Sequence, residues 1–153
     1  MTMDSRKFLN FVMNRWDLAM NILLYTAKHT ESGERLKRSL ERIASLQTLS
    51  DCGNLSELAT YFQTPAPLPE TVVLQASNRL DLQTFTAFRV RLEQVFFILV
   101  LPDADTATVA SGHKLRPRFI VYQDSDFSEV VAVLERLDAK QGADPKGLLL
   151  PLA

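Results

Sequence analysis

The residues best suited to bind another molecule lie in the segment SGHKLRPRFIVYQD, residues 111–124. Its basic and imidazole side chains are His113, Lys114, Arg116 and Arg118. If the segment is extended, the two-residue period of a strand places the three permanent cations on one face. Guanidinium groups bind phosphates and carboxylates through paired hydrogen bonds, so the cluster predicts contact with nucleic acid or an acidic partner. Arg89 and Arg91 are expected to join it if their segment packs nearby.

The same basic stretch also has a purely protective interpretation. Charged residues and proline before an edge strand prevent sheets from pairing edge to edge, and Pro117 interrupts the stretch. Aromatic side chains that could stack on bases are absent from residues 113–118, and only Phe119 and Tyr122 follow. A guarded sheet edge is therefore favoured over a nucleic-acid contact, with the binding hypothesis left open.

Acidic residues follow two of the predicted strands. They are Asp103, Asp105, Asp124 and Asp126. If these strands are parallel, the carboxylates meet at one edge of the sheet and could hold Mg²⁺ for phosphoryl transfer. Aspartate is also common in turns and helix caps, which is the favoured interpretation here, so no metal site is assigned.

Other catalytic chemistry is poorly represented. The single cysteine, Cys52, has no neighbouring base, and the two histidines, His29 and His113, are distant in sequence. No cofactor-binding or nucleophile motif occurs, and five glycines make a phosphate-binding loop improbable. We therefore expect no catalytic residue and no cofactor.

Residues 70–140 show the pattern of an α/β unit. Short apolar runs at 71–76, 95–101 and 118–123 predict three strands, and a helix is expected after Asp126. Residues 80–94 fit a helix, and Phe88, Val90 and Leu92 also fit a strand. The helix is chosen because it connects two strands as one β-α-β unit.

The first 63 residues have a helical period. Apolar residues from Phe8 to Ala27 predict one amphipathic helix, a second apolar stripe runs from Leu36 to Leu46, and Asn54 with Glu57 predicts the start of a short third helix. The first of these helices carries more apolar residues than one buried face needs. The residues expected to form a protein interface are Phe8, Phe11, Trp16 and Met20.

The expected fold is α/β or α+β, with a helical segment (1–63) packed on a small sheet of three to four strands with one or two helices. TPAPLP at 64–69 predicts a proline-rich strap between the two parts, and residues 141–153 a flexible tail.

Composition limits the possible functions. With 17 basic and 18 acidic residues the net charge is −1, so a broadly basic nucleic-acid surface is excluded, and only a local patch remains possible. One cysteine, no signal-peptide pattern and a longest apolar run of seven residues predict a cytoplasmic protein with no membrane partner.

These features predict a non-catalytic interaction or regulatory module, bound to a protein partner or to copies of itself. The alternatives are a nucleic-acid-associated accessory protein that uses residues 113–118, and a metal-dependent phosphoryl-transfer enzyme.

Overall fold

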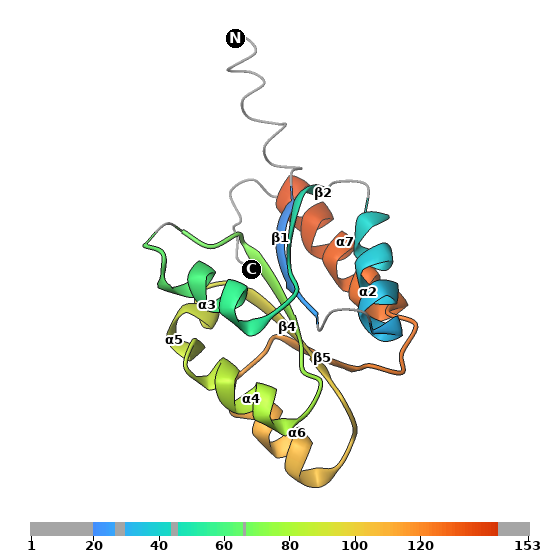
Figure 1. The fold of residues 1–153 in the computed structure, drawn as a ribbon. Helices are drawn as coiled ribbons and strands as arrows, with labels where there is room; N and C mark the ends of the chain where they lie inside the picture. The colour runs from blue at the N-terminus through green and yellow to red at the C-terminus, as the bar shows by residue number, and fades with distance from the viewer. Residues whose placement is uncertain (1–19, 27–29, 44–45, 66, 144–153) are drawn as a thin grey trace.

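The computed structural model describes residues 20–26, 30–43, 46–65 and 67–143 of the chain (Figure 1). They form a five-stranded parallel sheet with the strand order β2-β1-β3-β4-β5. The strands are β1 (Met20–Tyr25), β2 (Leu46–Cys52), β3 (Thr71–Gln75), β4 (Phe96–Leu101) and β5 (Phe119–Tyr122). The fold is therefore α/β, the first of the two expected classes, with more strands than the three or four predicted.

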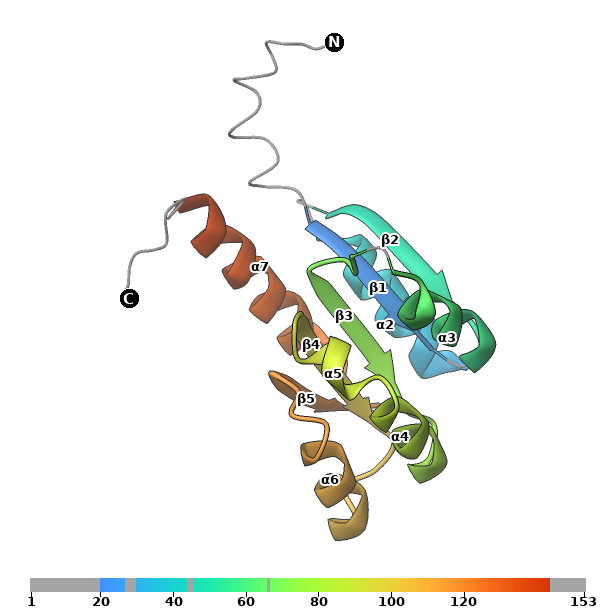
Figure 2. The ribbon, with the colours of Figure 1, turned by 90° about the vertical axis from the view of Figure 1, so that its left-hand side faces the viewer.

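Six helices of the described segments cover both faces of this sheet (Figure 2). They are α2 (Glu31–Glu41), α3 (Leu55–Gln63), α4 (Arg79–Thr86), α5 (Arg89–Leu92), α6 (Thr106–His113) and α7 (Ser128–Ala143). Buried residues of α2 and α7 pack on one face, and those of α3, α4 and α5 pack on the other, where α6 also lies. None of the helices described is long and apolar enough to cross a membrane.

The central strands are apolar at almost every position because both of their faces are covered. Residues alternate along β3 between the two cores, with Val72 and Leu74 on one side and Val73 on the other. Continuous apolar runs of this kind are typical of parallel sheets. The strands predicted at 71–76, 95–101 and 118–123 are confirmed as β3, β4 and β5.

Local side-chain bonds fix where several helices begin. Asn54 Oδ1 accepts a hydrogen bond from the Glu57 backbone N–H at 2.8 Å, and Glu57 Oε1 accepts one from the Gly53 N–H at 2.9 Å. This reciprocal pair confirms the predicted start of α3. Asn78 caps α4 in the same way, through the Asp81 N–H.

The helical interpretation of the first part of the chain is wrong for residues 20–25 and 46–52. Both segments are strands, and they pair in parallel as β1 and β2. β1 is buried on both faces, so its apolar residues satisfy the period of the helix predicted from Phe8 to Ala27 as well as that of a strand. β2 lies at the edge of the described sheet, and three of its residues are exposed. Its sequence therefore does not show a regular alternation of apolar and polar residues.

These two strands also correct the proposed division at residues 64–69. β1 lies between β2 and β3 and pairs with both, so the residues before and after the strap share one sheet. In the second part, the helix chosen for residues 80–94 is confirmed as two short helices, α4 and α5. Helix α6 was not predicted; its residues, TATVASGH, show no amphipathic period.

Candidate functional site

The predicted basic cluster lies on a tight turn between α6 and β5, which we call the cationic turn (His113–Arg118). Lys114 ends α6, and its backbone N–H donates to the Ala110 carbonyl at 3.3 Å. The Arg116 N–H donates to the His113 carbonyl at 3.0 Å, and the Arg118 N–H donates to the Phe97 carbonyl of β4 at 2.8 Å. The turn is thus bonded to the end of its helix and to the sheet.

The backbone of the turn is not the extended strand that was expected. Arg116 has φ 56°, in the left-handed region, and Leu115 is 1% exposed within the core. The strand period therefore does not place the cations on one face. They are nevertheless all exposed, because Leu115 alone turns inward.

The charges of the cationic turn are not neutralised within the described segments. None of its four side chains forms an ion pair with a described carboxylate, and the Arg118 guanidinium lies 5.7 Å from the centroid of the Phe96 ring. Such a contact positions the guanidinium and leaves its charge in place. The turn is a preformed group of exposed cations.

Arg91 does not belong to this surface, which corrects the prediction. Its Nη1 donates to the carbonyl oxygens of Phe62 at 2.9 Å and Thr64 at 2.8 Å, so the guanidinium caps the C-terminal end of α3. Arg89 is exposed and lies 3.9 Å from the Glu93 carboxylate in the same helix region. Neither residue contacts the cationic turn in any hydrogen bond or ion pair described.

The guarded-edge interpretation agrees with the position of the turn. β5 is an edge strand with β4 as its one neighbour, and Pro117 and Arg118 directly precede it. Protection of a sheet edge and binding of a partner use the same exposed charges. The position of the cationic turn beside β5 therefore fits both interpretations.

The carboxyl ends of the strands are where α/β sheets bind ligands, at the point where the strand order reverses. Here that point lies between β1 and β3. Gln75, at the end of β3, is 2% exposed, and its Nε2 donates to Ser32 Oγ of α2 at 2.9 Å. Gln75 Oε1 has no hydrogen-bond partner among the described residues, and Thr26 is buried just after β1. This part of the edge carries neutral side chains.

The acidic residues converge only in part. Asp103 and Asp124 line one hollow of about 460 Å³ at the ends of β4 and β5, and Asp105 and Asp126 do not line it. The pKa of Asp103 is lowered by the nearby Thr108 hydroxyl and by the Asp105 backbone N–H, which donates to Asp103 Oδ1 at 3.0 Å. Among the described residues no three His, Cys, Asp or Glu side chains could share a metal ion. The ligand set that metal-dependent phosphoryl transfer required is not assembled here.

Asp126 has the capping role that was expected for it. Its Oδ1 accepts hydrogen bonds from the Ser128 backbone N–H at 2.9 Å and the Ser128 hydroxyl at 2.8 Å, which lower the pKa of the Asp126 carboxyl. This carboxylate therefore caps the start of α7.

The predicted helical interface cannot be placed as a whole. Phe8, Phe11 and Trp16 lie outside the described residues. Met20 is the first residue of β1 and is 2% exposed in the core against α2 and α7, so its assignment to an interface is wrong.

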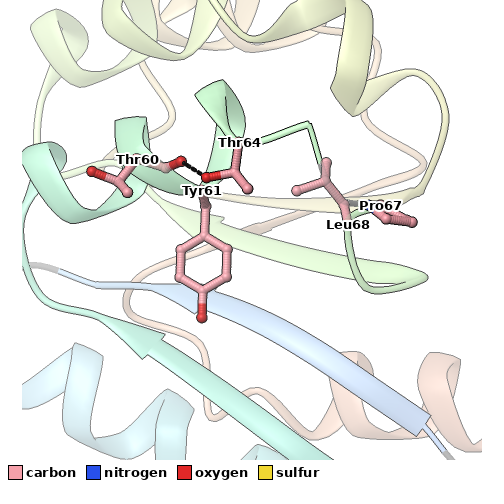
Figure 3. A pocket seen from close by; sticks show the side chains of 5 residues that line it. All are labelled: Thr60, Tyr61, Thr64, Pro67 and Leu68. Atoms are coloured by element: carbon pink, nitrogen blue, oxygen red, sulfur yellow. Dashed lines mark hydrogen bonds between the residues drawn. The ribbon is translucent and has the colours of Figure 1, made fainter.

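A small apolar pocket, not predicted from the sequence, lies between α3 and the segment that follows it (Figure 3). Its volume is about 200 Å³, and its lining residues are Thr60, Tyr61, Thr64, Pro67 and Leu68. Figure 3 shows the Tyr61 ring projecting away from Pro67 and Leu68, and the ring is 37% exposed. In the sequence, only the prolines of residues 64–69 distinguish this region, and they predicted a strap and not a pocket.

The order of the strands and the helices on both faces define a class of fold: the chain resembles the receiver domains of response regulators. It matches the isolated receiver domain of RcsB from Salmonella enterica serovar Typhimurium with a TM-score of 0.63, at 13% identity, over 78% of this chain and 88% of that one. The signal receiver domain of the putative response regulator NarL from Mycobacterium tuberculosis matches at 0.55 and 16%, over 79% and 97%.

The same fold also occurs in a protein with a different described role. A pilus assembly protein, CpaE, from Caulobacter crescentus matches with a TM-score of 0.56 at 17% identity, over 77% of this chain and 98% of that chain. No protein-family model matches the sequence. No curated protein matches it either. The comparisons therefore establish the fold and leave the function to be argued from the residues.

Proposed function

We propose that this chain is a non-catalytic regulatory module that acts by binding a partner protein. The likeness to signal receiver domains over more than three quarters of the chain supports a regulatory role. The observation that supports the proposal most directly is which side chains lie at the carboxyl ends of the sheet strands. Where an α/β enzyme places its ligand, this chain has the hydrogen bond between Gln75 and Ser32 and the buried Thr26.

The residues at that edge support binding rather than chemistry. Buried amide and hydroxyl groups do not donate a proton readily, and Asp103 Oδ1 already accepts a hydrogen bond from the Asp105 backbone N–H. A nucleic-acid-associated role is a second candidate, supported by the four exposed side chains of the cationic turn.

The test combines isolation of the complex with an assay for hydrolysis. The tagged chain, purified from its source cells, is expected to run in light scattering at a mass that includes a stoichiometric protein partner or further copies of itself. With Mg²⁺ and p-nitrophenyl phosphate it is expected to show no turnover above buffer.

A monomer that hydrolyses the ester would contradict the proposal, provided that Asp103→Asn and Asp124→Asn abolish the turnover. Asp105→Asn is the matched control, because Asp105 is exposed and does not line the same hollow.

A further inference from the structure

The cationic turn has features that go beyond edge protection. We propose that His113–Arg118 binds an acidic, extended segment of a partner protein. The inference rests on the proposed function and names the chemistry of the partner.

The backbone of the cationic turn is fixed in place by the surrounding fold. Its backbone is held by the hydrogen bonds of Lys114 to α6 and of Arg118 to β4, and Leu115 is anchored in the core. Side chains on a fixed backbone lose less conformational freedom when they bind, which favours recognition over a flexible basic loop.

Arg116 is the residue of the turn that lies at a left-handed backbone position. A helix end commonly places glycine or asparagine there, because other side chains are strained at positive φ. This chain has Arg116, with φ 56°. A strained conformation occupied by a long cationic side chain at the surface points to a role for that side chain.

Three cations elsewhere in the described segments are engaged by neighbouring polar groups, unlike those of the cationic turn. Lys37 lies 3.0 Å from Asp51, Arg91 caps α3, and Arg35 donates to the carbonyl oxygens of Gln123 and Ser125. The negative end of the α6 dipole accounts for cations in its last turn, but Arg116 and Arg118 lie beyond that turn. The helix therefore explains only half of the cluster.

The net charge, the number of cations in the turn and the exposure of the aromatic rings favour an acidic protein over nucleic acid as the partner. The whole chain has a net charge of −1, and this turn offers three permanent cations, too few for the array of phosphate contacts typical of nucleic-acid binding. Of the described aromatic residues, only Tyr61 is exposed, at 37%, and it lies on α3. The Phe96 ring is already covered by Arg118.

The edge of β5 gives the partner its conformation. β5 pairs with β4 and with no other described strand, so its second edge can accept an extended segment through backbone hydrogen bonds. Cations beside this edge repel a second copy of the turn and attract a segment that carries carboxylates.

The experiment titrates a fluorescein-labelled oligoglutamate peptide with the whole chain and follows fluorescence anisotropy. Binding is expected at low ionic strength and should weaken near about 0.15 M salt, where exposed charges are screened. Labelled single-stranded and duplex DNA are titrated in parallel and are expected to bind more weakly than the peptide.

Three variants separate binding from stability. Arg116→Asn removes the charge with a residue that tolerates positive φ, so peptide binding should weaken about two- to fivefold, with no fall in Tm. Arg116→Lys should bind as the wild type does. Arg38→Gln is the matched control, because Arg38 is an exposed arginine on α2, which covers the other face of the sheet.

The triple variant Lys114→Gln/Arg116→Asn/Arg118→Gln should lose measurable binding of the peptide. Unchanged binding in this variant would overturn the inference. So would DNA binding tighter than peptide binding, or a fall in Tm of Arg116→Asn. A partner that still co-purifies with the triple variant would refute this inference and leave the proposed function standing.

Discussion

Arg91 and Arg116 show that one residue type has two roles in this chain, according to the backbone that carries it. The Arg91 guanidinium donates to carbonyl oxygens at the end of α3, so it stabilises a helix terminus. Arg116 lies at positive φ on a turn and points to solvent. The sequence presents both as surface cations within basic stretches, and only their contacts distinguish them.

The reactivity of Cys52, at the end of β2, likewise depends on the surroundings that the fold gives it. Burial raises the pKa of its thiol to about 11, with Glu57 and Asp51 adding to the rise. At pH 8 about one thiol in a thousand is then ionised, and the thiolate is the reactive form. We expect no reaction of the native chain with Ellman's reagent at pH 8, and full reaction in concentrated guanidinium chloride.

A cysteine introduced at the exposed Ser56 is the control for this experiment, and it should react at once in the native chain. Rapid, stoichiometric labelling of native Cys52 would show that the thiol is accessible and ionised, contrary to the burial described.

At the scale of elements, one side chain joins α2 to the loop between β5 and α7. Arg35 of α2 donates to the Gln123 carbonyl at 2.7 Å and to the Ser125 carbonyl at 3.1 and 3.3 Å, just before α7 begins. Its guanidinium also lies 5.3 Å from the centroid of the Phe127 ring. The loop between β5 and α7 is thereby fixed to α2.

Arg35→Ala should lower the free energy of unfolding by about 2–3 kcal/mol, because it removes hydrogen bonds from a charged donor to partly buried carbonyls. Urea denaturation measures this change. Arg38→Ala, one turn away on the exposed side of α2, should change the free energy by less than about 0.5 kcal/mol. Equal effects of the two substitutions would mean that the loss of stability reflects helix propensity and not the bonds of Arg35 to the loop between β5 and α7.

At the scale of the whole molecule, the order of the strands makes the first and second parts of the chain interdependent. β1 and α2 come early in the sequence, yet Leu24, Leu36 and Leu40 share a core with Val73 of β3 and Val100 of β4. Neither part contains a complete core, so the strap near residues 64–69 is not a boundary between independent units.

A fragment of residues 70–153 should therefore fail to unfold cooperatively. Without β1, β3 becomes an edge, and without α2 one face of β3 and β4 is exposed to water. Circular dichroism during heating should show one cooperative transition for the whole chain and none for the fragment. A sharp transition of the fragment would restore the division proposed from the sequence.

Several elements in both parts of the chain could be predicted from local pattern. The run VFFILVL, closed by Pro102, requires burial on both faces, and Asn54 and Glu57 fix the start of α3 through bonds three and four residues apart. β1 was missed because a strand buried on both faces is apolar throughout and also fits the period of a helix. For the binding surface, the sequence identified the cations of residues 113–118 and not the left-handed turn that presents them.

The sequence by itself determined where apolar runs, caps and cations occur, because each depends on residues a few positions apart. Tertiary structure decided which of these features meet. Arg91 finds its acceptors 27 and 29 positions away, and Arg35 finds one 88 positions away. Such contacts depend on how the strands are ordered in the sheet, which no local pattern specifies. The cationic turn is therefore available to a partner for a tertiary reason: the fold engages Arg35 and Arg91 elsewhere and leaves Lys114, Arg116 and Arg118 exposed.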